Sequence, residues 1–173
     1  TGRPRELELR RIVNAILYLV RSGIQWRMMP REYPKWQSVY YYFQKWRKDG
    51  TWKRVHDTFR AQERRKKGRH KHPTAASIDS QSVEGTLVGG IRGYDAGKKV
   101  NGRKRHIVVD TLGLVLAVLV TPASISDPAG ARKLIRRLSS SGKKLQKIWA
   151  DGTYRGSLLA WVEARFRSVI EPV

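Results

Sequence analysis

Two aspartates, Asp79 and Asp151, lie within or at the end of predicted β-strands, where a carboxylate can bind a ligand. Asp79 lies inside a run of β-type residues, where a charged side chain disfavours a strand and is costly to bury without a partner. Asp151 directly follows the short apolar run 148–150, at the carboxyl end of a predicted strand, where α/β sheets usually bind ligands. If the two strands are parallel neighbours, both carboxylates emerge at one edge of the sheet. There they repel each other unless they share a divalent cation such as Mg²⁺, which prefers oxygen ligands.

Each of these aspartates also has a purely structural interpretation, and other groups are weaker candidates. An aspartate before glycine, as in Asp151-Gly152, is a common turn former, and Asp110 has the same interpretation at the end of another predicted strand. Of the four histidines, only His70 and His72 have a spacing that could suit a metal, and they lie in a basic linker, where contacts or a passive role are expected. The glycines form no phosphate loop that leads into a helix. The chain contains no cysteine, which excludes disulfides, cysteine zinc sites and thiol catalysis.

The elements that would position the two aspartates follow Pro73. Alternating and apolar runs predict strands, a turn at 111–113 predicts a hairpin, and Asp127 is a good N-cap for a helix. The predicted order is strand 74–83, strand 106–110, strand 114–120, a helix from 127, strand 147–150, helix 157–166 and strand 168–173. Together with the helices before Pro73, this order indicates an α+β class, and it is compatible with a mixed sheet.

The residues before the basic run 64–72 predict a small bundle of three helices. An apolar stripe from Leu9 to Val20 predicts the first helix, with Gly23 just beyond its end, and aromatic residues predict the second between Trp36 and Trp46. Thr51 is a plausible N-cap for the third. Such a bundle is similar to a helix-turn-helix-like DNA-binding unit. The sequence therefore predicts a helical DNA-binding domain at 1–62, a basic linker at 63–73 and a second domain at 74–173.

The charge of the chain indicates what it binds. Lys and Arg number 36 against 14 Asp and Glu, a formal net charge of +22, and a field of this strength most often serves phosphate contacts. An apolar content of 40% predicts a folded chain, and the longest apolar stretch, 112–123, is too short to span a bilayer. Nucleic acid is the expected partner, and a cytoplasmic, nucleoid-associated location fits. The expected DNA-binding residues are Lys45, Arg47, Lys48, Lys53 and Arg54 in the bundle and Lys98, Lys99, Arg103, Lys104 and Arg105 before the second strand; in the alternative interpretation these charges are only solvated surface.

Several motifs in one order carry a family resemblance. They are GIQWRMMP at 23–30, SIDSQ at 77–81, GYDAGKKVNGRKRHIVVDTLG at 93–113 and ADGTY at 150–154. Together they resemble the DDE transposases of the insertion-sequence-five type. The resemblance implies a ribonuclease-H-like catalytic domain, a mixed sheet flanked by helices, in which Asp79 and Asp151 are catalytic and bind Mg²⁺, with Mn²⁺ as a substitute. It also implies strand cleavage and transfer at DNA ends by in-line phosphoryl transfer, and a homodimer or higher oligomer.

One part of the family's pattern is missing. The third catalytic acid of the family, a glutamate, is expected on a helix after the last strand, and the sequence reaches Val173 before such a helix. Glu163 and Glu171 lie on the wrong elements to replace it, so the catalytic domain is expected to be C-terminally incomplete. Three alternatives therefore remain beside an active transposase: a truncated derivative that binds DNA or inhibits, an upstream product completed by frameshifting, and a ribosomal-type RNA-binding protein, which Asp79 and Asp151 disfavour.

Overall fold

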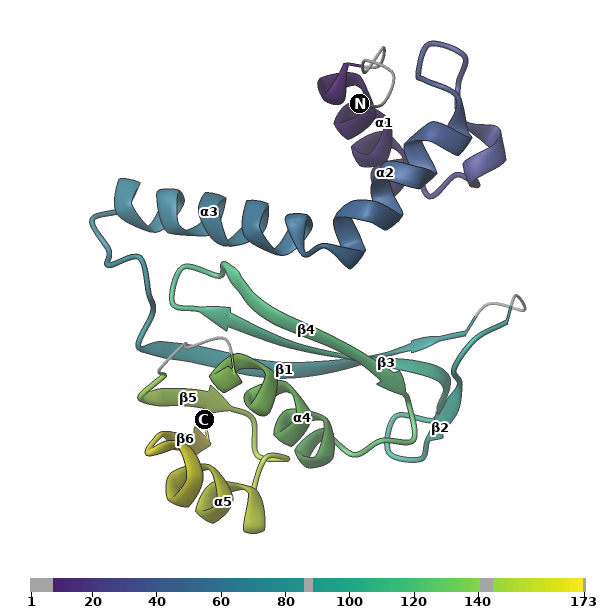
Figure 1. The fold of residues 1–173 in the computed structure, drawn as a ribbon. Coiled ribbons are helices and arrows are strands. Elements are labelled where there is room, and N and C mark those ends of the chain that lie inside the picture. The colour runs from purple at the N-terminus through teal and green to yellow at the C-terminus, as the bar shows by residue number, and fades with distance from the viewer. Residues whose placement is uncertain (1–7, 86–88, 141–144, 173) are drawn as a thin grey trace. The chain divides into compact units, whose positions relative to one another are not determined.

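A computed structural model of the chain describes residues 8–85, 89–140 and 145–172 (Figure 1). The chain divides into two compact units, Thr1–Phe59 and Arg60–Val173. The division falls inside helix α3 (Thr51–Lys66), which continues through residues 63–66 of the predicted linker. The described residues include no helix that is long and apolar enough to cross a membrane.

The first unit consists of helices, as the apolar spacing predicts. Besides the first turns of α3, it contains α1 (Leu9–Ser22), the short 3₁₀ helix η1 (Trp26–Met28) and α2 (Trp36–Lys48). Helix α1 ends at Gly23, whose positive φ of 70° and N–H bond to the Leu19 carbonyl confirm it as the C-terminal cap. The core of the first unit comprises Ile12, Ala15, Ile16 and Val39. The side chains of Trp26, Phe43, Trp46 and Trp52 pack against this core. Val20, at the end of the predicted stripe, is 67% exposed, so the stripe is only partly buried.

The second unit contains the predicted mixed sheet and one strand more. Its strands are β1 (Ala75–Glu84), β2 (Gly93–Asp95), β3 (Val100–Asp110), β4 (Val115–Pro122), β5 (Lys147–Ala150) and β6 (Val169–Pro172), and its further helices are α4 (Asp127–Ser140) and α5 (Ser157–Phe166). The strand order is β2-β3-β1-β5-β6, with β4 beside β3. β3 runs antiparallel to β1 and β4, whereas β5 runs parallel to β1 and β6. A helical N-terminal part followed by a mixed sheet with helices confirms the predicted α+β, mixed fold class.

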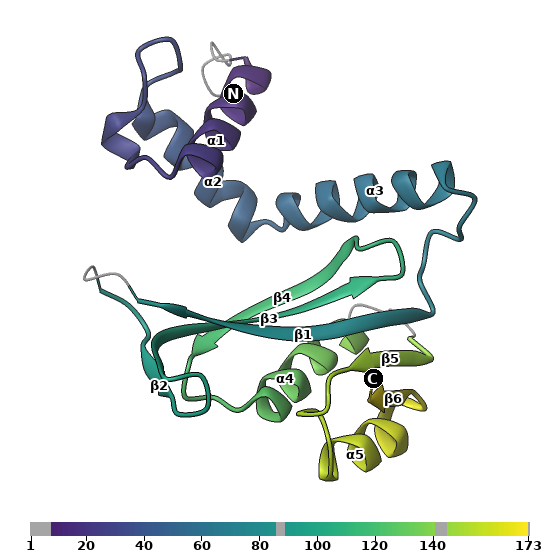
Figure 2. The same cartoon turned by 180° about the vertical axis from the view of Figure 1, so that it is seen from behind.

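Helices α4 and α5 pack on the same face of this sheet (Figures 1 and 2). The core beneath them includes Ile78, Val108, Leu134, Ile148 and Tyr154. Helix α4 approaches β3 so closely that a Cβ at Gly130 would lie 2.1 Å from the ring of His106. We call this the helix-covered face. The opposite face carries the exposed side chains of Asp79, Gln81, Arg105, Val118 and Val120, and we call it the exposed face.

Candidate active site

The sheet brings Asp79 and Asp151 to the same edge. β1 and β5 are parallel neighbours with the pairs Ala75↔Lys147, Ala76↔Ile148 and Ser77↔Trp149. Continued by two residues, this register places Asp79 opposite Asp151, which directly follows the last residue of β5. Because residues two apart on a strand share a face, the side chain of Asp79 follows that of Ser77 on the exposed face, and Asp151 is exposed directly after β5. The parallel neighbourhood on which the predicted pair depends is therefore present.

The local backbone orients each carboxylate through one oxygen. Asp79 Oδ1 accepts a hydrogen bond from the Ser80 N–H at 2.6 Å. Asp151 Oδ1 accepts bonds from the N–H of Thr153 at 2.8 Å and from the Thr153 hydroxyl, and the Asp151 carbonyl accepts the N–H of Tyr154 at 3.1 Å. Asp151 therefore also forms a turn, as its structural interpretation predicted. The Oδ2 atoms of both aspartates make no hydrogen bond within the described ranges, so one oxygen of each is open to a ligand.

The donor chemistry of these two carboxylates fits part of a metal site. Hard oxygen donors at an exposed sheet edge suit Mg²⁺, which is commonly held by one or two carboxylates together with substrate phosphates and water. Among the residues that the structure describes, no group of three His, Asp or Glu side chains could hold a metal ion. Glu171 instead forms an ion pair with Lys147, and the hydrogen bond from this lysine lowers the pKa of Glu171. Glu163 is exposed on α5.

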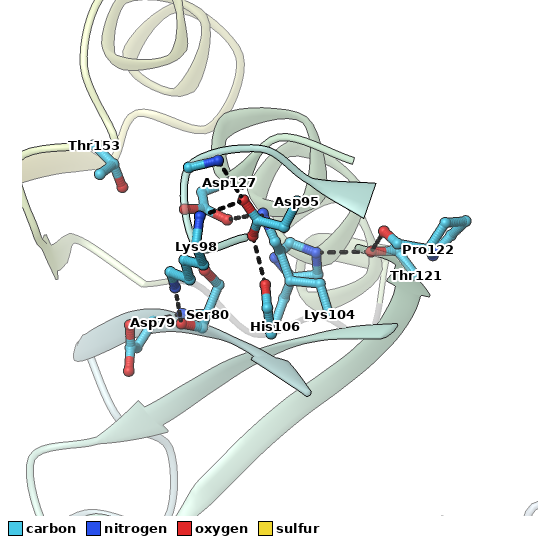
Figure 3. Close-up of polar contacts among 12 residues, drawn as sticks. Asp79, Ser80, Asp95, Lys98, Lys104, His106, Thr121, Pro122, Asp127 and Thr153 are labelled. Atoms are coloured by element: carbon cyan, nitrogen blue, oxygen red, sulfur yellow. Dashed lines mark hydrogen bonds and ion pairs between the residues drawn. The ribbon is translucent and has the colours of Figure 1, made fainter. Parts of the chain in front are cut away.

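A second acidic cluster lies on the helix-covered face, and sequence reasoning missed it. The Lys104 ammonium lies 3.0 Å from Asp95 and 3.0 Å from Asp127 (Figure 3). Hydrogen bonds from Ser82 and Lys104 hold the pKa of Asp95 well below its usual range. Burial opposes the charge of Lys104, but its two carboxylate partners raise the pKa of Lys104 overall. At 4% exposure, Lys104 is part of a buried ion pair network, and it cannot reach a phosphate on the surface as the charge pattern suggested.

Tyr154 connects the turn after Asp151 to the core. Its side chain is fully buried, and its hydroxyl has no hydrogen-bond partner among the described residues. Burial raises the pKa of Tyr154, and the charges of Asp127, Asp79 and Asp151 act in the same direction.

The other predicted DNA-binding residues of the second unit have different surroundings. Lys98 Nζ donates to the Ser80 carbonyl at 3.2 Å (Figure 3). Arg103 donates to the carbonyls of Ile91 and Gly89, and Arg105 Nη2 donates to Gln81 Oε1 at 2.6 Å. Lys99 is exposed in the turn between β2 and β3, with a positive φ of 55°. Asp110, predicted to be a turn residue, accepts the N–H groups of Leu112 and Leu114 and also forms a buried ion pair with Arg64.

The predicted DNA-binding residues of the first unit lie around the junction of α2 and α3. Lys45, Arg47 and Lys48 are exposed in the last turn of α2. Lys53 forms an ion pair with Asp57 at 2.7 Å. Arg54 donates to the Asp49 carbonyl and to the Thr51 hydroxyl, both at 2.8 Å. Thr51 is the first residue of α3 rather than its cap, and its N–H donates to Asp49 Oδ1 at 2.9 Å.

Comparison with known proteins gives the family. Residues 1–56 match a family model described as "Putative transposase of IS4/5 family", and residues 70–172 match the model "Transposase DDE domain". No match was found among curated proteins. Two solved structures are similar to the chain, "Crystal structure of the Mos1 Strand Transfer Complex" and "Mos1 transposase paired-end complex with left transposon end", each at 10% identity with a TM-score of 0.38. All of this chain is covered, but it spans only 60% of each Mos1 chain. Since the DDE match alone spans residues 70–172, more than half of the sequence, the chain belongs to the DDE transposase family.

Proposed function

We propose that the chain is a transposase that binds insertion-sequence DNA ends and carries out strand cleavage and strand transfer by in-line phosphoryl transfer with Mg²⁺, or Mn²⁺ in its place. The observation that carries the proposal is the parallel register of β1 and β5, whose last pair, Ser77↔Trp149, lies two residues before each aspartate, together with one open oxygen on each carboxylate. Membership of the DDE transposase family supports the same reaction class.

Asp79 and Asp151 would hold the metal in this reaction. The ion, when bound, supplies activation of the attacking water or 3′-hydroxyl and stabilisation of the leaving oxygen. The chain's own contribution is orientation. The Ser80 N–H holds one oxygen of Asp79, and Thr153 holds one oxygen of Asp151, so that the other oxygens are presented at the same edge.

The cationic residues would hold the DNA. In the first unit, the exposed side chains of Lys45, Arg47 and Lys48, with Lys53 and Arg54 at the following helix, form the proposed contact surface of a DNA-binding domain. In the second unit, Lys98, Lys99, Arg103 and Arg105 would follow the phosphate backbone near Asp79. Phosphate contacts of this kind position DNA without reading its sequence. A homodimer or higher oligomer at the nucleoid in the cytoplasm completes the proposal.

The test is cleavage of linear DNA that carries the terminal inverted repeats of the element, in Mg²⁺ or Mn²⁺. We expect end-specific nicking by the wild-type chain and its loss in Asp79→Asn and in Asp151→Asn, with DNA binding retained by both variants. The exposed Glu163 provides a matched control, because Glu163→Gln removes a carboxylate outside the site and should leave nicking unchanged.

A second candidate function is a DNA-binding derivative that lacks catalysis and acts as an inhibitor. It is favoured by the finding that the described ranges contain no group of three metal-binding side chains. The same experiment separates the two functions. End-specific binding with no nicking, equal in the wild type and in Asp79→Asn, would replace the enzyme by the DNA-binding derivative.

A further inference from the structure

Arg105 shares the exposed face with Asp79. The register of β1 and β3 pairs Gln81 with Arg105 and Asp79 with Ile107. Because alternate residues of a strand point to the same face, Asp79 and Gln81 lie together on β1 and Ile107 and Arg105 on β3. Asp79 and Arg105 are therefore diagonal neighbours across the strand pair, a spacing that long side chains bridge. Both side chains are exposed.

Arg105 is hydrogen-bonded to a neutral side chain, Gln81, which does not compensate the positive charge of the guanidinium. Its Nη2 donates to the neutral amide oxygen of Gln81 at 2.6 Å, and no carboxylate of the described residues forms an ion pair with it. The adjacent Lys104, on the opposite face, is neutralised by two carboxylates at 3.0 Å each. A guanidinium fixed at one nitrogen by an amide keeps its full charge and its remaining donors, in a planar fork that matches a phosphate.

Other cations of the same hairpin are less suited to this place. Arg103 lies one step further from Asp79, opposite Val83, and donates to two backbone carbonyls. Lys98 donates to the carbonyl of Ser80, whose own side chain is buried on the helix-covered face. Arg105 combines an exposed position, an oriented side chain and an uncompensated charge beside Asp79.

We propose that Arg105, oriented by Gln81, binds the DNA phosphate that reacts at Asp79 and Asp151. The inference rests on the proposed function and adds a substrate-binding residue to it. Arg105 would hold a non-bridging oxygen of the scissile phosphodiester, and Gln81 is a positioning residue that acts through the guanidinium. Arginine donors strengthen their hydrogen bonds on charged oxygens, so the contact depends on the negative charge of that one phosphate.

The first test measures binding without turnover. Two duplexes carrying the terminal inverted repeat are compared in EDTA, one unmodified and one with an uncharged methylphosphonate at the scissile position. The wild type should bind the unmodified duplex about tenfold more tightly. Arg105→Gln should bind the two duplexes equally. Lys99→Gln, which removes a cation from the neighbouring turn, should weaken both and keep the tenfold difference. The inference is overturned if Arg105→Gln keeps the wild-type difference.

The second test measures cleavage. Arg105→Gln should lower the rate of end nicking on the order of 100-fold, the scale of losing one donor to a reacting oxyanion. Gln81→Glu places a carboxylate against the guanidinium and should lower the rate while leaving the arginine intact, which provides a second variant if Arg105→Gln does not fold. Arg165→Gln, an exposed arginine on α5, is the matched control and should nick at the wild-type rate.

The outcomes separate this inference from the proposed function. Nicking by the wild type that is lost in Asp79→Asn but unchanged in Arg105→Gln rejects only the role of Arg105. If the wild type does not nick at all, the proposed function fails, and the binding comparison with the methylphosphonate duplex still decides whether Arg105 contacts that phosphate.

Discussion

On the helix-covered face of the sheet, Asp95 and Asp127 share the ammonium of Lys104, whereas on the exposed face neither Asp79 nor Arg105 pairs with an opposite charge among the described residues. Lys104 and Arg105 are consecutive in the sequence, and the alternation of β3 alone sends them to opposite faces. Charges that are buried must be paired, because desolvation is costly, while exposed charges remain hydrated and can bind a ligand. The same residue types therefore stabilise the fold on one face and are available for chemistry on the other.

The largest effect expected from this comparison is on stability. Lys104→Met removes the cation and leaves the buried Asp95 and the mostly buried Asp127 without their partner, so the free energy of unfolding should fall by about 3 to 5 kcal/mol. Arg105→Met, the exposed neighbour, should change it by less than about 0.5 kcal/mol. Denaturant unfolding followed by circular dichroism measures both. If both variants lost the same free energy of unfolding, the cations of the two faces would contribute equally to stability, and the comparison would fail.

The sequence predicted the elements that have a local signal and missed those that depend on pairing with other strands. Strand 147–150 and helix 157–166 were predictable to the residue, because apolar runs with clear breaks on both sides define them. The sequence placed Asp79 and Asp151 at one edge only on the condition that their strands are parallel neighbours, and the structure meets this condition. Three consecutive cations at 103–105, by contrast, have the appearance of a solvated loop. Their strand is stabilised by pairing with β1 and β4, and that pairing has no local signal.

Two further features, the short strand β2 and the buried side of β3, had no readable signal in the sequence. The strand β2 has three residues, too few for a periodic pattern. The side of β3 that is buried, and with it the role of Lys104, is known only once the register is known, since a shift of one residue exchanges the two faces. The partner of Lys104 on α4, Asp127, is recognisable as a helix N-cap from sequence, but its ion pair is not.

A smaller effect is expected where α4 meets the buried side of β3. In Gly130→Ala the new Cβ would lie 2.1 Å from the ring of His106, a fully buried side chain whose Nε2 lies 3.0 Å from the Thr121 hydroxyl. Overpacking of this kind should lower the free energy of unfolding by about 1 to 3 kcal/mol. Gly89→Ala is the control, because a Cβ there meets no atom within 4 Å. Thermal unfolding of the two variants compares them, and an unchanged Gly130→Ala would show that the helix can move away from the sheet at little cost.

The smallest expected effect is a pH-dependent change in stability, which should occur on substitution of Asp127 on the helix-covered face but not of Asp79 on the exposed face. Burial alone would raise the pKa of Asp127, but hydrogen bonds from Ser80 and Lys104 lower it overall, so its ionised form favours the folded chain. A carboxylate whose pKa is lowered by folding stabilises the fold above its unfolded value of 3.8, and this contribution is lost as the pH falls through the folded value. Asp127→Asn should therefore cost about 1 to 2 kcal/mol at pH 7. Its difference from the wild type should shrink once the pH falls below the unfolded value.

The matched variant on the exposed face is Asp79→Asn. Its carboxylate accepts a hydrogen bond only from the adjacent Ser80 N–H among the described residues, so the substitution should change the free energy of unfolding by less than about 0.5 kcal/mol at either pH. Denaturant unfolding of both variants at neutral and acidic pH measures the difference. If Asp79→Asn showed the same pH-dependent loss as Asp127→Asn, Asp79 would be an acid that stabilises the fold through a charged partner. Its open oxygen would then not be available for a metal ion.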